Sequence, residues 1–111
     1  MKVNTSQLGE FAVVEIDGEV DAEHVAFLKK ALLPLKDGGI KGIALNLTRV
    51  PFIDSTGLGI LISLMRQVKE QGKQLRLVGL SDEVRSIFEI TRLHRVFDLC
   101  ETVEKAIQEM R

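Results

Sequence analysis

The sequence predicts a single α/β domain over residues 1–111, with a mixed sheet of about four to five strands and about four helices. Two observations carry this prediction. Short apolar runs typical of strands alternate along the chain with longer segments whose apolar residues recur at helical spacing. Two strand-like segments also open the chain, so the sheet begins with an antiparallel pair and continues through right-handed parallel crossovers. The predicted order is β-β-α-β-α-β-α-(β)-α.

The first half of the chain supplies two strands, a helix and a third strand. Residues 3–7 and 11–17 flank a short turn and form the opening antiparallel pair. Asp21 is placed to cap the first helix, because its carboxylate can accept a hydrogen bond from an unpaired N–H. Pro34 predicts a kink or an end of that helix, since proline has no N–H and its ring clashes with the preceding turn. Residues 43–47 then form a buried strand.

The second half alternates helices with short strands. A strongly apolar segment predicts a mostly buried helix that ends near residues 71–72. Residues 74–78 give the next strand, and a third helix is capped by one of the polar residues 81–82. Residues 96–99 are a candidate short edge strand. A last amphipathic helix begins near residues 101–102.

Composition excludes several classes of function. With 45% hydrophobic and 28% charged residues the chain is typical of a globular domain. A formal net charge of -1 gives no reason to expect nucleic acid or an anionic membrane as partner, and five Phe without Trp or Tyr are too few for a stacking platform. A single cysteine, Cys100, and the absence of an apolar leader favour a cytoplasmic protein.

Residues 50–59 join the buried strand to the long apolar helix and form the candidate functional site. An acid, Asp54, and two hydroxyls, Ser55 and Thr56, precede two glycines here. At a helix N-terminus, unpaired N–H groups and the helix dipole favour negative charge, so a covalent phosphate would be tolerated. A purely structural role is also open: the hydroxyls could cap the helix, and Gly57 and Gly59 could permit close packing.

The segment Phe52–Gly59 resembles the STAS-domain anti-sigma factor antagonists, also called anti-anti-sigma factors. Their hallmark is Asp-Ser-(Ser or Thr)-Gly-x-Gly between an apolar strand and a helix. The resemblance extends over the whole chain. Gly18-Glu19-Val20-Asp21 is similar to the family's Gly-Glu-(Leu, Ile or Val)-Asp, residues 43–47 to its hydrophobic strand, and residues 72–75 and 87–93 to two later motifs.

The resemblance implies a regulatory protein, not an enzyme. In such a system the unphosphorylated domain binds an anti-sigma factor, a serine kinase of the histidine-kinase-like ATPase fold, and frees the sigma factor. The kinase then phosphorylates the motif, and the modified domain is released. A PP2C-type serine phosphatase restores it. ATP and metal belong to these partners, so no cofactor is expected in this chain, and a monomer is expected.

Carried onto this sequence, the resemblance assigns phosphorylation to Ser55, with Thr56 as second choice. In family members that read Asp-Ser-Thr-Gly, phosphorylation is generally assigned to the serine. In members that read Ser-Ser, the residue just before the glycine is modified. Asp54 is expected to orient the loop, to bond the acceptor hydroxyl or the kinase, and to cap the helix. A phosphate is expected to disrupt an interface, not to refold the domain. The residues expected to form the loop and contact the partner are Asp21, Asp54, Ser55, Thr56, Gly57, Leu58 and Gly59.

Other functions remain open beside the switch. No sequence feature excludes a STAS scaffold that is never phosphorylated and assembles with a transporter or signalling complex. A receiver domain would use Asp54 as phosphoacceptor, but it needs an acidic pair after the first strand, and Glu15 and Asp17 lie on a strand and at its end. His24 and His94 lie far apart in the chain without partnering cysteines, so no metal site is expected.

Overall fold

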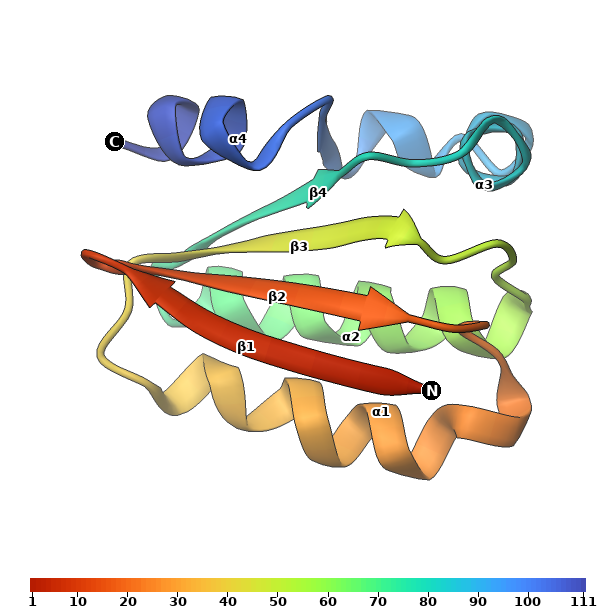
Figure 1. Ribbon diagram of the computed structural model, residues 1–111, viewed down its shortest axis with the longest axis horizontal. Coiled ribbons are helices and arrows are strands. Elements are labelled where there is room, and N and C mark those ends of the chain that lie inside the picture. Colours follow the sequence, from red (N-terminus) through yellow and green to blue (C-terminus); the bar gives the residue numbers. More distant parts are fainter.

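The sheet contains five strands whose spatial order, β1-β2-β3-β4-β5, repeats their order along the chain. A computed structural model describes residues 1–111 (Figure 1). The first two strands pair antiparallel and all later neighbours pair parallel. This confirms the predicted mixed α/β sheet. The strands span Lys2–Leu8 (β1), Phe11–Asp17 (β2), Gly42–Arg49 (β3), Gln74–Val78 (β4) and Asp98–Cys100 (β5).

Four α-helices and three short 3-10 segments connect the strands. In Figure 1, α1 and α2 run side by side below the sheet, and α3 and α4 lie at the top of the drawing. No helix combines the length and the apolar character needed to cross a membrane. The helices span Val25–Leu32 (α1), Ser55–Glu70 (α2), Asp82–Ile90 (α3) and Val103–Met110 (α4), and the 3-10 segments span Ala22–His24 (η1), Leu33–Asp37 (η2) and Leu93–Arg95 (η3).

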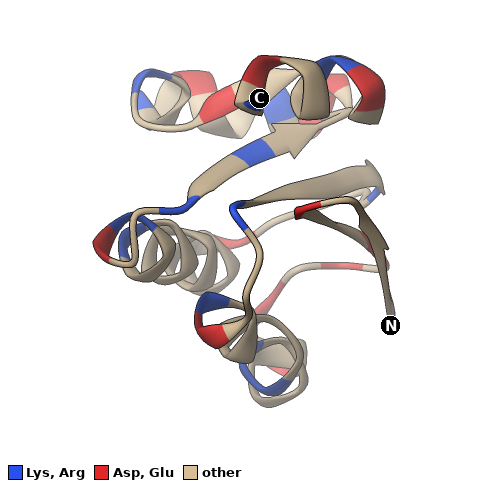
Figure 2. Ribbon diagram, turned by 90° about the vertical axis from the view of Figure 1, so that its left-hand side faces the viewer, with Lys and Arg blue, Asp and Glu red and all other residues tan.

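Two hydrophobic clusters fill the two sides of the sheet. Along β3, Leu45 belongs to the larger cluster under α1 and α2, whereas its neighbour Ala44 belongs to the smaller cluster under α4. Successive side chains of a strand point to opposite faces, so a strand covered on both sides is apolar at nearly every position. Figure 2 shows acidic and basic residues interspersed on the helices that enclose this core.

The predicted helix boundaries are confirmed where a capping side chain or a proline sets them. Ser81 Oγ accepts a hydrogen bond from Val84 N at 3.2 Å and so begins α3. Thr102 Oγ1 accepts one from Lys105 N at 3.1 Å and begins α4. Helix α1 ends before Pro34, which lies in the first turn of η2, where a missing N–H leaves no bond unmade.

The predicted strand at residues 96–99 is wrong in position, because β5 begins two residues later, at Asp98. The backbone N–H groups of Val96 and Phe97 donate to the carbonyl oxygen of Leu93, at 2.9 and 3.0 Å. These bonds close the turn that follows α3, so neither residue can donate to β4. Pairing with β4 therefore starts at Asp98, opposite Arg76.

Candidate functional site

The loop after β3 is fixed by the carboxylate of Asp54, which acts on two different elements. Its Oδ1 accepts a hydrogen bond from Gly57 N at 2.8 Å and caps α2. Its Oδ2 accepts one from Ala22 N at 3.0 Å, at the start of η1. One side chain therefore joins the beginning of α2 to the segment that leads into α1. The expected cap by Asp54 is confirmed, whereas its carboxylate makes no hydrogen bond to the hydroxyl of Ser55 or Thr56.

Backbone bonds hold the same two segments together. Val20 N donates to Phe52 O at 3.0 Å, and Asp54 N donates to Val20 O at 3.2 Å, which makes Val20 and Ile53 an isolated parallel bridge. A Cβ on Gly57 would overlap the Val20 carbonyl group. The predicted close packing is thus confirmed at Gly57, because only a residue without a side chain fits there.

Ser55 and Thr56 are the first two residues of α2, and both are exposed. Neither hydroxyl takes part in a hydrogen bond within the chain, since the cap comes from Asp54. The alternative prediction that these hydroxyls cap the helix is therefore wrong. Both remain free to react with or contact a second molecule, in a position where the first N–H groups of the helix have no intrahelical partner.

The remaining residues of the motif divide between core and surface. Leu58 lies in the hydrophobic core, with 8% of its surface exposed, so it supports the loop from within. A Cβ on Gly59 would meet no atom within 4 Å, so close packing does not require glycine there. Thr56 and Gly59 instead line a groove of about 410 Å³ between α2 and α1, together with Val25, Lys29, Leu33, Ile60 and Ser63.

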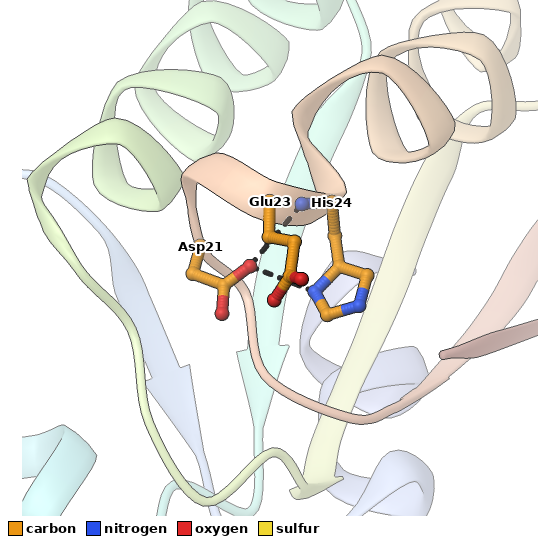
Figure 3. Close-up of side chains that lie close together, drawn as sticks. All are labelled: Asp21, Glu23 and His24. Atoms are coloured by element: carbon orange, nitrogen blue, oxygen red, sulfur yellow. Dashed lines mark hydrogen bonds and ion pairs between the residues drawn. The ribbon is translucent and has the colours of Figure 1, made fainter.

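Asp21 lies at the start of η1 and is nearly buried, with 9% of its surface exposed. Its Oδ1 accepts a hydrogen bond from His24 N at 3.2 Å and contacts the ring Nδ1 at 2.7 Å (Figure 3). Burial alone would raise the pKa of Asp21, but hydrogen bonds and attraction from His24 outweigh it and hold this pKa below the ordinary value. The predicted cap at Asp21 is confirmed for η1, the 3-10 turn that leads into α1, whereas α1 itself has His24 at its N-cap position and no side-chain cap.

Two residues at the site were not predicted from the sequence. His24 meets Asp21 because residues three apart in a 3-10 turn lie on the same side, and a histidine three positions after a capping acid is the signal that could have identified it. Phe52 lies two residues before Asp54 and is 46% exposed. A large apolar residue between a proline and a helix cap is the corresponding signal.

Comparison with known proteins assigns the chain to a family. The STAS domain family matches residues 2–106. The anti-sigma-B factor antagonist of Staphylococcus aureus (strain NCTC 8325 / PS 47) is 32% identical over 104 residues, which cover 94% of this chain and 96% of that protein. The protein of the same name from Staphylococcus epidermidis is 29% identical over 104 residues, with the same coverage of 94% and 96%.

Solved structures share the architecture. An anti-sigma factor antagonist from Mycobacterium paratuberculosis has a TM-score of 0.89 at 22% identity, covering 99% of this chain and 93% of that chain. The Bacillus cell fate determinant SpoIIAA in its phosphorylated form has a TM-score of 0.73 at 24% identity, covering 99% and 100%. Sequence identity at this level shows the fold, while the family match and the staphylococcal relatives show the family. The chain therefore belongs to the STAS-domain family of anti-sigma factor antagonists.

Proposed function

We propose that this chain binds an anti-sigma factor and that phosphorylation of Ser55 ends the binding. In the unphosphorylated form it docks on the anti-sigma factor, a serine kinase of the histidine-kinase-like ATPase fold, and frees the sigma factor. The kinase phosphorylates Ser55, the complex dissociates, and a PP2C-type serine phosphatase restores the hydroxyl. The chain is a substrate in this cycle and not an enzyme. ATP and the phosphatase metal belong to the partners, and the cycle takes place in the cytoplasm.

The observation that carries the proposal is a pair of free hydroxyls on a capped helix. Ser55 and Thr56 are exposed in the first turn of α2, and Asp54 has already supplied the cap. A kinase can therefore reach either hydroxyl without breaking a bond that holds the loop. The name of the staphylococcal relatives supports the anti-sigma factor as partner, and SpoIIAA, which is described in a phosphorylated form, supports the modification.

The surroundings of the two hydroxyls favour Ser55 as the acceptor. Thr56 lines the groove between α1 and α2, where its side chain lies among residues such as Lys29 and Ser63. Ser55 comes directly after the capping residue and is the first residue of α2. Phe52 is exposed close by in the sequence and offers an apolar contact for a docking partner. Thr56 remains the second choice.

The expected effect of the phosphate is on binding and not on the fold. A phosphoserine adds about -1.5 to -2 charges at neutral pH. At a helix N-terminus the dipole stabilises negative charge by about 0.3–1 kcal/mol. The loop is also held by backbone bonds that the phosphate does not touch. Burying an unpaired charge at an interface costs about 3–5 kcal/mol, so affinity should fall by about a hundredfold or more.

Site-resolved phosphopeptide mass spectrometry on the chain isolated from its native cells tests the proposal. Trypsin releases residues 50–66 as one peptide, because it cuts after Arg49 and after Arg66. This peptide carries Ser55, Thr56 and a third hydroxyl, Ser63, which serves as an internal control for site assignment. We expect a phosphate on Ser55 whose occupancy changes with growth condition.

Two outcomes would contradict the proposal. A phosphate on Ser63 alone would place the modification outside the proposed site. No phosphate under any growth condition, with full coverage of residues 50–66, would favour the alternative function: a STAS scaffold that assembles with a transporter or signalling complex and is never phosphorylated. Occupancy on Thr56 instead of Ser55 would keep the switch and correct the acceptor.

A further inference from the structure

Three side chains in the segment that leads into α1 converge beside the candidate site. Asp21, Glu23 and His24 each offer one ligand atom, and these atoms all lie within 4.8 Å of one another. Figure 3 shows both carboxylates and the imidazole ring turned toward a common point. Ligand atoms about 2.1 Å from a shared metal ion lie at most about 4.2 Å apart. Small side-chain rotations are therefore enough to bring all three onto one ion.

The local backbone holds two of these side chains in place. In the 3-10 turn η1, residues three apart eclipse each other, so Asp21 and His24 lie on the same side. Asp21 Oδ1 accepts from His24 N at 3.2 Å and lies 2.7 Å from the ring Nδ1. When an ion binds, Glu23, which is exposed, has to turn toward the other two side chains, and Asp21 Oδ1 and His24 Nδ1 have to move slightly apart, because two ligand atoms of a tetrahedral ion lie about 3.3 Å from each other.

The charges at this point are not balanced within the chain. No lysine or arginine forms an ion pair with Asp21 or Glu23, and His24 is the one basic side chain that contacts Asp21. Two carboxylates this close repel each other. A divalent cation between them would offset both charges.

We propose that Asp21, Glu23 and His24 bind one divalent transition-metal ion of the zinc class, with water completing the coordination shell. Zinc takes imidazole nitrogen and carboxylate oxygen as ligands, and an imidazole ligand favours zinc, cobalt or nickel over magnesium and calcium. The ring binds through Nδ1 with its proton on Nε2, so the contact between Nδ1 and Asp21 Oδ1 is replaced by a bond from each atom to the ion. In the sequence His24 and His94 lie far apart without partnering cysteines, which predicts no metal site; the proposed site needs no second histidine, because Asp21 and Glu23 supply the other ligands.

The ion would lie next to the candidate phosphorylation loop. Ala22, between the ligands, donates its N–H to Asp54 Oδ2 at 3.0 Å. A metal ion on η1 therefore restrains Asp54 and the start of α2 in the arrangement seen. An ion that binds only the folded chain also raises the unfolding temperature, because the added stability grows with the logarithm of the ion concentration over the dissociation constant. This site does not depend on the proposed function and can exist without phosphorylation.

Isothermal titration calorimetry tests the site. Zinc chloride is titrated into the untagged full chain in a buffer that does not chelate metal. We expect one ion per chain. His24→Asn and Glu23→Gln should each weaken binding by about tenfold or more, since loss of even an outer-shell partner costs about 10–100-fold. His94→Asn is the matched control, because it makes the same substitution at an exposed histidine outside the cluster and should bind as the wild type does.

Absence of saturable zinc binding by the wild-type chain would overturn the proposal. So would a His24→Asn variant that binds unchanged, or a His94→Asn variant that loses binding to the same degree. Circular dichroism without metal establishes that each variant is folded. The visible ligand-field spectrum of cobalt gives a second readout on the wild type: bands from a nitrogen and oxygen coordination shell support the site, and the spectrum of hydrated cobalt refutes it.

Discussion

Asp54→Ala removes two hydrogen-bond acceptors that hold different elements. Oδ1 caps α2 through Gly57 N at 2.8 Å, and Oδ2 accepts from Ala22 N at 3.0 Å. Loss of a cap costs about 1 kcal/mol. A hydrogen bond to a charged group contributes about 1.5–3 kcal/mol, but the contact with Ala22 is exposed and water replaces part of it. We expect the free energy of unfolding to fall by about 2–3 kcal/mol in total.

Urea denaturation measures this loss from the shift of the midpoint. Ser81→Ala is the matched control, because Ser81 caps α3 through Val84 N and no second element depends on its hydroxyl. It should cost about 1 kcal/mol. Asp54→Asn keeps an acceptor oxygen for the cap and loses the charge, so its stability should lie between those of the wild type and Asp54→Ala.

Hydrogen exchange separates the two contacts of Asp54. In Asp54→Ala the amide of Ala22 should lose its protection along with that of Gly57, because both donate to the carboxylate. The reasoning is refuted if Asp54→Ala costs no more than Ser81→Ala. It is equally refuted if the Ala22 amide exchanges at the wild-type rate, since the bond between the two segments would then contribute nothing.

Three more predictions concern stability. Gly57→Ala should destabilise by about 1–3 kcal/mol or more, because its Cβ overlaps the Val20 carbonyl group, whereas Gly59→Ala meets open space in a helix and should stabilise by about 0.5–1 kcal/mol; urea midpoints that move in the same direction for the two variants would contradict this contrast. Arg92 has a φ of 61°, so Arg92→Gly should stabilise by about 1 kcal/mol, and a lower midpoint would show that its side chain outweighs the backbone cost. The pKa of Asp21 is held below 3.8, so its contribution to stability is present above that pH and is lost as pH falls through the folded-state pKa. Asp21→Asn should therefore flatten the acid limb of the stability curve, and an acid limb of unchanged slope would argue against it.

Local signals in the sequence are enough to predict most of the secondary structure. The alternation of apolar residues places β2 at residues 11–17 and β4 at residues 74–78, as observed. Both depend on neighbours within a few positions. The shift of β5 to Asp98 has a different origin, because the bonds of Val96 and Phe97 to Leu93 depend on how the chain turns after α3.

The contacts at the candidate site also fall into local ones, which the sequence suggests, and distant ones, which it does not. The cap of α2 by Asp54 involves residues within one helical turn, so a sequence motif is enough to suggest it. The bond from Ala22 to the same carboxylate joins residues 32 positions apart. The fit of Gly57 under Val20 is also a contact between distant segments. No local pattern encodes the distance between two loops.

The sequence by itself determined the order of strands and helices, the helix caps, and the acid and hydroxyls at the start of α2, because these follow from hydrophobic periodicity and from bonds within one turn. Only the tertiary structure decided that Asp54 serves two segments, that Ser55 and Thr56 have free hydroxyls and that Glu23 and His24 converge on Asp21. The physical reason is that parallel strands bring the loops after β2 and β3 to the same edge of the sheet, where contacts form between residues that are far apart in the chain.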